Sequence, residues 1–157
     1  MRYPLQVLLK IRTDREATAA AKLSREIREE ERCRQVFGER ARELDAYRDW
    51  CAAEAERILS RLTLSILPKA EVDRARSQIL WNQEAESAYA QRLEAARDAL
   101  AAAIAAKDLA AEERRLAGVA RERISLHREE WLKVERRRAE AEEEAELQEV
   151  AELLYFL

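Results

Sequence analysis

Apolar residues recur at alternating intervals of four and three along the first half of the chain. From Phe37 they form a heptad seam of eight positions, seven of them apolar: Phe37, Ala41, Leu44, Arg48, Cys51, Ala55, Ile58 and Leu62. This spacing is typical of a coiled-coil helix. Carried back toward the N-terminus, the same register meets polar side chains within the seam, so the helix should continue there with looser packing: Arg34, Glu30, Ile27, Leu23, Ala20, Glu16, Thr13 and Leu9.

The chain has only two prolines, Pro4 and Pro68, and each is expected to open a helix. Proline is accepted at the first position of a helix but disfavoured in its interior. The sequence therefore predicts helix 1 over about residues 4–63, a turn over about 64–68, and helix 2 over about 69–155. Residues 1–3 are expected to fray. The predicted fold is all-α: residues 1–157 form a single elongated antiparallel coiled-coil hairpin whose second helix is longer.

A reversal near residue 66 fixes which residues should face each other across the hairpin. Partner numbers should add to about 132, which places apolar residues opposite apolar residues along the length: Leu62 and Val72, Cys51 and Leu80, Trp50 and Trp81, Ile27 and Ile104, Leu23 and Leu109, Leu9 and Ile124. The alanine-rich stretch 95–106 should allow close approach of the helices. Residues 131–157 are left without a partner, although Leu147, Val150, Leu154 and Leu157 share one helical face. Another subunit or a second copy should cover that face.

The composition supports a thin apolar seam rather than a thick globular core. Charged residues make up 39% of the chain and aromatic residues only 6%. A net charge of −3 with interleaved signs gives no drive toward nucleic acid or direct membrane insertion. Cys33 and Cys51 lie about 27 Å apart on one predicted helix, so they cannot pair within the chain and are expected to be reduced cytoplasmic thiols.

Nothing in the sequence predicts catalysis. His127 is the only histidine, and a solvated or seam-edge role fits it better than acid–base chemistry. The glutamates at 129–130 and 142–144 lack the Glu-x-x-His pairs of carboxylate metal sites, and there is no glycine-rich phosphate loop. We expect no enzymatic activity, no cofactor and no metal.

Tyr47, Trp50 and Trp81 should cluster on the hairpin about six turns from its tip. Local packing across the seam is one interpretation of this cluster. The other is a partner-binding surface, because a slim hairpin can hardly bury three large rings. The residues alone leave both interpretations open.

Three short segments of the chain resemble those of a known family. The first is Arg2-Tyr3-Pro4-Leu5, with Val7-Leu8, Ile11 and Asp14-Arg15; the second is Tyr47-Arg48-Asp49-Trp50, with Glu56-Arg57 and Leu59; the third is the run from Leu126 to Lys133. Together they resemble the type III secretion stalk proteins of the SctO/YscO family, chlamydial type, which are related to flagellar FliJ. The first is similar to the start of the chlamydial-type members, the third to their C-terminal Leu-His-Lys-Glu-Glu-Trp segment, and the second to the segment before the hairpin in YscO-type members.

The resemblance implies a cytoplasmic hairpin at the cytosolic face of a secretion apparatus. It would link the hexameric ring ATPase to the cytoplasmic domain of the export gate and stimulate ATP hydrolysis without binding nucleotide; substrate chaperones are a further expected partner. By this analogy the end with both termini enters the ATPase, and the half nearer the tip contacts the gate. The corresponding hypothesis assigns Leu8, Arg12, Arg15, Trp131, Arg136 and Arg137 to the ATPase, and Leu44, Tyr47, Trp50 and Trp81 to the gate.

Two other functions are compatible with the pattern. The first is a structural coiled-coil rod in which the two segments pair between chains. The second is a chaperone-binding adaptor whose main client is a secreted protein. Light scattering tests the rod, and pull-down against ATPase, gate and chaperones tests the adaptor.

Overall fold

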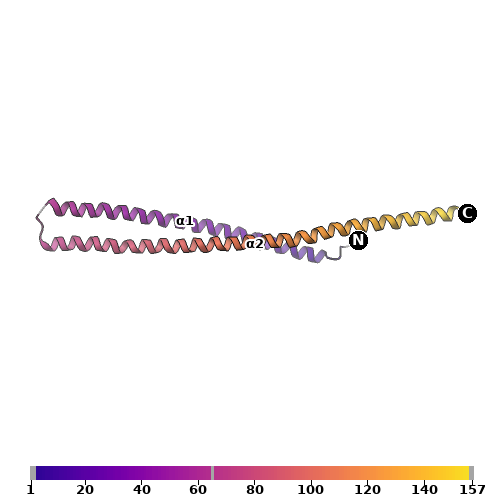
Figure 1. Cartoon of the computed structure of the whole chain (residues 1–157), viewed down its shortest axis with the longest axis horizontal. Coiled ribbons are helices and arrows are strands. Elements are labelled where there is room, and N and C mark those ends of the chain that lie inside the picture. Colours follow the sequence, from indigo (N-terminus) through magenta and orange to yellow (C-terminus); the bar gives the residue numbers. More distant parts are fainter. Residues whose placement is uncertain (1–2, 65, 156–157) are drawn as a thin grey trace. The chain divides into compact units, whose positions relative to one another are not determined.

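The computed structural model describes residues 3–64 and 66–155 and contains two α-helices, α1 (Gln6–Leu64) and α2 (Lys69–Tyr155) (Figure 1). No strand occurs within these residues. The contacts between α1 and α2 of the same chain are those of a helical hairpin, so the predicted all-α fold with a longer second helix is confirmed. Ser65 of the predicted turn and Leu157 of the predicted C-terminal stripe lie outside the described residues.

Both prolines lie just before a helix. The carbonyl oxygen of Pro68 accepts hydrogen bonds from the backbone N–H groups of Glu71 and Val72, at 2.9 and 3.4 Å, so α2 begins directly after it. Pro4 instead lies in a turn, with the N–H of Gln6 donating to the carbonyl of Tyr3 at 3.2 Å. As a result α1 begins two residues after its predicted start. Tyr3 is only 5% exposed, so the expectation that this residue frays is wrong.

The contacts divide the chain into two compact units. The tip unit consists of residues 24–109, and the terminal unit of residues 1–23 and 110–157. In each unit a segment of α1 lies against an antiparallel segment of α2. The interpretation of residues 1–157 as one domain stays a prediction.

In the tip unit one inward row of α2, in which residues repeat every seven positions, consists mainly of small side chains. Ala75, Asn82, Ala96 and Ala103 are buried and Tyr89 is half-buried. The facing row of α1 contains larger side chains, of which Leu44 and Ile58 are 4% and 5% exposed. A small row against a large row lets two helices approach closely without leaving voids. This row of α1 is the one that the heptad pattern predicted.

The second seam row of the tip unit differs from the prediction. The pattern placed Arg48 inside the seam, but Arg48 is exposed and Tyr47 is half-buried beside it. On α2, the predicted seam residues Val72 and Leu80 are exposed, and Ala75 and Ile79 lie inward in their place. Both helices therefore turn a slightly different face inward than predicted. On α1 the reason is that the ring of Tyr47 buries more apolar surface than the side chain of Arg48 can.

In the terminal unit the register between the two helices also differs from the prediction. Lys22 forms an ion pair with Glu113 at 2.7 Å, whereas the predicted register placed residue 110 opposite it. Leu109, predicted to face Leu23, is 61% exposed, and the next residue, Ala110, is completely buried. The antiparallel direction was predicted correctly, but the register is offset by about three residues.

The C-terminal segment of α2 has no helix beside it within the terminal unit (Figure 1). Every residue from 140 to 155 is exposed, including the predicted apolar stripe of Leu147, Val150 and Leu154. The unpaired segment is shorter than predicted, because Trp131 is half-buried and its ring lies 5.5 Å from that of Tyr3. The segment from 140 to 155 thus presents all its side chains to solvent.

Candidate partner-binding surfaces

An aromatic stack crosses from α1 to α2 in the tip unit. The ring of Tyr47 on α1 lies nearly parallel to that of Tyr89 on α2, with centroids 4.5 Å apart and planes at 20°. Trp50, one turn after Tyr47, packs against the ring of Tyr47, with ring centroids 5.6 Å apart and planes at 34°. The guanidinium carbon of Arg92 lies 5.4 Å from the centroid of the Tyr89 ring, a cation–π geometry. These four side chains are called the aromatic stack below.

The position of Tyr47 within the stack is fixed by a hydrogen bond as well as by ring contact. Its hydroxyl donates to the backbone carbonyl of Asn82 on α2 at 3.1 Å. Removal of this hydroxyl from water raises the pKa of Tyr47, and the nearby Cys51 thiol adds to the rise. The hydroxyl therefore stays protonated through the neutral range and keeps its role as donor. A ring held at both its face and its tip has little freedom to rotate.

The aromatic cluster predicted from the sequence is correct for Tyr47 and Trp50 and wrong for Trp81. Among the described residues, no ring contact joins Trp81 to Tyr47 or Trp50. Trp81 instead borders a shallow hollow on α2 with Ala70, Asp73, Arg74, Ser77 and Gln78. The error arises because Trp81 directly precedes the buried Asn82, and adjacent residues project about 100° apart round a helix, so Trp81 lies off the inward row.

The four predicted gate-contact residues differ in how far a partner can reach them. Trp50 and Trp81 are 48% and 67% exposed. Leu44 is buried in the seam, so it packs the hairpin and cannot contact a partner while α1 and α2 stay paired. Tyr47 is half-buried in the aromatic stack. The accessible part of this surface is therefore formed by the two tryptophans.

Tyr89 and Arg92 belong to the aromatic stack, but the sequence analysis did not identify them. Tyr89 lies seven residues after Asn82 and seven before Ala96, on the inward row of α2. That spacing could have identified it as a seam residue. The predicted register, however, placed residue 85 opposite Tyr47, so the stacking of the two tyrosines was not anticipated.

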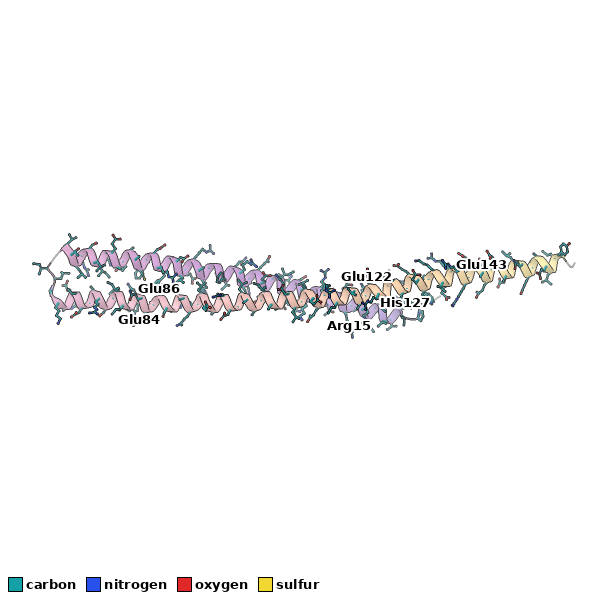
Figure 2. The ribbon with its side chains drawn as sticks, in the orientation of Figure 1. Arg15, Glu84, Glu86, Glu122, His127 and Glu143 are labelled. Carbon is teal, nitrogen blue, oxygen red and sulfur yellow. The ribbon has the colours of Figure 1, made fainter. Side chains whose placement is uncertain are left out.

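Two ion pairs connect α1 and α2 near the seam of the tip unit. Arg48 donates to Glu86 at 2.7 Å, and Figure 2 shows Glu86 on the side of α2 toward α1, whereas Glu84 points away. Lys107 lies 2.8 Å from the carboxylate of Glu30, which is buried and also accepts from Arg34. The hydrogen bond from Lys107, followed by that from Arg34, lowers the pKa of Glu30, and Glu30 in turn raises the pKa of Lys107. Both groups stay charged near neutral pH.

An aromatic clasp, consisting of Tyr3, His127 and Trp131, closes the paired part of the terminal unit. The Tyr3 hydroxyl and His127 Nδ1 are 2.8 Å apart, and the Tyr3 ring contacts both the imidazole and the indole (Figure 2 labels His127). Tyr3 lies before α1 begins, so these contacts hold the non-helical start of the chain on α2. The sequence resemblance included all three residues, but the heptad pattern did not predict that they meet.

The predicted ATPase-contact residues lie in two parts of the terminal unit. Leu8 and Arg12 are half-buried on α1, and Arg15 is exposed there (Figure 2). Arg136 and Arg137 are exposed on α2 beyond the clasp. Among the described side chains, none of these four arginines forms an ion pair with a carboxylate. Arg15, Arg136 and Arg137 are thus exposed cations without an ion pair among the described residues, although Arg137 still interacts electrostatically with Glu130. Further along α2, Glu143 projects from the segment with no helix beside it (Figure 2).

The described part of the chain contains no group of three or more side chains suited to hold a metal ion. Neither α1 nor α2, over the residues described, has a stretch apolar enough to cross a membrane. The features that stand out among the described residues are exposed aromatic and cationic side chains on a helical hairpin, and the class of protein is therefore an all-α hairpin.

Comparisons with known proteins agree with this class and identify the family. A family model for the type III secretion protein YscO matches residues 5–153, and the chain belongs to this family. The resemblance seen in the sequence is therefore confirmed, and the protein is a type III secretion component. A solved structure of a YscO homologue from Chlamydia trachomatis has the same fold, with a TM-score of 0.85 at 23% identity over 99% of this chain and 95% of that chain. A comparison of the sequence with curated proteins finds no match.

Proposed function

We propose that this protein is the non-enzymatic central stalk of a type III secretion system. In this role it links the hexameric ring ATPase to the cytoplasmic domain of the export gate, at the cytosolic face of the apparatus, and stimulates ATP hydrolysis during export. One observation supports the proposal beyond family membership: the exposed tryptophans lie in one unit. Trp50 and Trp81 of the tip unit are exposed, whereas Trp131 of the terminal unit is half-buried and the exposed candidate contacts there are Arg15, Arg136 and Arg137.

The tip unit is proposed to bind the gate. Exposed tryptophans are enriched among the residues that dominate binding energy, since each buries a large rigid surface at small entropic cost. Trp50 and Trp81 are the gate contacts in this proposal, Tyr47 supports Trp50, and Leu44 is removed from the set because it is buried.

The terminal unit is proposed to bind the ATPase. Arg12, Arg15, Arg136 and Arg137 offer cations to acidic surfaces, and Leu8 and Trp131 add apolar area near the clasp. Contacts between exposed charges are screened by salt and form and break readily. Such contacts suit a stalk that must move relative to a ring of equivalent subunits.

A crossed binding experiment tests the proposal. The variants Trp50→Ala and Trp81→Ala, and separately the triple variant Arg15→Ala/Arg136→Ala/Arg137→Ala, are assayed by calorimetry against the purified gate domain and by ATPase stimulation. We expect each tryptophan variant to weaken gate binding by about tenfold or more with stimulation unchanged, because a central tryptophan contributes about 2 kcal/mol or more. The triple variant should lose stimulation and keep gate binding.

Ile27→Ala is the matched control, since Ile27 is an exposed apolar residue of the same unit about 35 Å along α1 from Trp50. Far-UV circular dichroism should be the same for all variants. If every variant lost gate binding and ATPase stimulation to the same extent, the proposal that the gate and the ATPase bind separate surfaces would be wrong. Retention of both, together with binding of substrate chaperones, would favour the adaptor function instead.

A further inference from the structure

Tyr89 is an exception within one inward row of α2, in which residues repeat every seven positions. Between residues 75 and 103 this row has four small side chains, three alanines and Asn82, and one ring, that of Tyr89. Small residues at such positions allow close helix approach, and a ring at the same position can be accommodated only if the opposing side chain lies flat against it. Tyr47 does so, with its ring 20° from the plane of Tyr89.

Tyr89 is connected to the exposed Trp50 through Tyr47. The indole of Trp50 packs against the ring of Tyr47, which stacks on Tyr89 and whose hydroxyl donates to the Asn82 carbonyl. The orientation of an exposed side chain on α1 therefore depends on a ring that belongs to α2. Without Tyr89, Tyr47 would keep its hydroxyl contact but could swing about it, and Trp50 would lose its fixed support.

Arg92 adds a further contact to the Tyr89 ring. Its guanidinium lies over the Tyr89 ring, and it forms no ion pair with a described carboxylate. A cation over a ring face is attracted to the ring, so this contact favours the present orientation of Tyr89. The order of contacts is thus Arg92, Tyr89, Tyr47 and Trp50.

We propose that Tyr89 is a positioning residue that, through Tyr47, fixes the orientation in which Trp50 meets the export gate. The proposal rests on the proposed function, because it assumes that Trp50 contacts the gate. Tyr89 itself touches no partner in this account. Binding benefits because Trp50 is already ordered before the complex forms, so less conformational entropy is lost on association.

The first part of the test measures Trp50 alone. In a Trp81→Phe/Trp131→Phe background Trp50 is the single tryptophan, and its fluorescence anisotropy decay reports the local rotation of the indole. We expect Tyr89→Ala to add a fast component of rotation, Tyr89→Phe to leave the decay unchanged, and Tyr89→Leu to resemble Tyr89→Ala because it restores bulk without a flat ring. Circular dichroism of each variant checks that the helices are intact.

The second part measures affinity for the purified gate domain with all native tryptophans present. Tyr89→Ala and Tyr89→Leu should weaken binding by about three- to tenfold, the range expected for loss of one aromatic pair, and Tyr89→Phe should bind normally. Arg92→Ala should have a smaller effect of the same sign.

The positioning role is overturned if the Trp50 decay is the same in Tyr89→Ala as in the parent, or if Tyr89→Leu behaves like Tyr89→Phe in both measurements. The affinity of Trp50→Ala distinguishes failure of this positioning role from failure of the proposed function on which it rests. If Trp50→Ala leaves gate affinity unchanged, the assignment of Trp50 to the gate is wrong, while the anisotropy decay still decides whether Tyr89 holds the indole.

Discussion

The two units are built from the same pair of helices but differ in the apolar side chains that they bury. In the tip unit, aliphatic side chains such as Leu44 and Ile58 are almost completely buried, and a tyrosine pair stacks across the seam. Among the described residues of the terminal unit, the buried apolar residues are Tyr3 and Ala110. Ion pairs join the helices in both units, but with less aliphatic burial those of the terminal unit, Lys22–Glu113 and Glu16–Arg121, make up a larger share of its contacts.

This difference matters because the two kinds of contact respond differently to change. Buried aliphatic volume is costly to remove and insensitive to salt, whereas partly exposed ion pairs contribute little each and are screened. The tip unit is therefore expected to be the more stable unit, and the terminal unit to open more readily. Three predictions test this comparison, taken from the largest effect to the smallest.

Leu44→Ala should destabilise the tip unit by about 2–4 kcal/mol, because it removes a buried side chain from a close-packed seam. Urea unfolding followed by circular dichroism measures the change. The matched control is Leu59→Ala on the same helix, where the side chain is 54% exposed and the expected change is within about 0.5 kcal/mol. Equal effects of the two substitutions would mean that the seam does not hold this unit together.

Tyr3→Ala should loosen only the terminal unit. Loss of a buried ring costs about 1.5–3 kcal/mol locally, so amide exchange in the first turns of α1 and around His127 should accelerate by about ten- to a hundredfold. Tyr3→Phe keeps the ring contacts and loses only the hydrogen bond, so its effect should be smaller, about 1 kcal/mol. Hydrogen-exchange mass spectrometry resolves the two units, and faster exchange in residues 24–109 would show that they are not independent.

Glu30→Gln should remove part of the acid sensitivity of the tip unit. The pKa of Glu30 is lowered from 4.5, so its ion pair stabilises the fold above that value and is lost as pH falls through the folded-state pKa. Lys107 has its pKa raised from 10.5, so the pair also weakens as pH rises above this range. Thermal melts at pH 7 and pH 3 should differ less for Glu30→Gln than for the parent. Glu31→Gln, at an exposed neighbouring position, should behave like the parent.

The hairpin could be predicted from the sequence because the signals that indicate it lie within short segments of the chain. Pro68 marks the reversal, and the heptad spacing from Phe37 to Leu62 identifies the inward row of α1, with Leu44 and Ile58 buried as predicted. These signals depend on helical geometry alone, which a single sequence contains. The family resemblance, too, rested on short contiguous segments.

The register and the aromatic contacts could not be predicted, because they depend on which side chains meet between helices. An offset of about three residues is less than one helical turn, yet it changes the residue opposite Lys22 from 110 to 113. The inward face differs as well, because Ala110 is buried and Leu109 is exposed. The heptad rule favours apolar seam residues, so it placed Leu80 inside and overlooked Asn82, which is buried although polar. Tyr3 was missed because it lies before the helix begins, where periodicity gives no information.

The alanines on the inward face of α2 also bear on how this protein can diverge. Ala96 and Ala103 are buried, whereas many outward side chains form contacts only within their own helix, as in the pairs Arg97–Glu94 and Arg115–Glu112. A mutation at such an outward position is therefore expected to be nearly neutral for folding. Homologues of this protein should be recognised better by where small residues recur along the second helix than by overall identity.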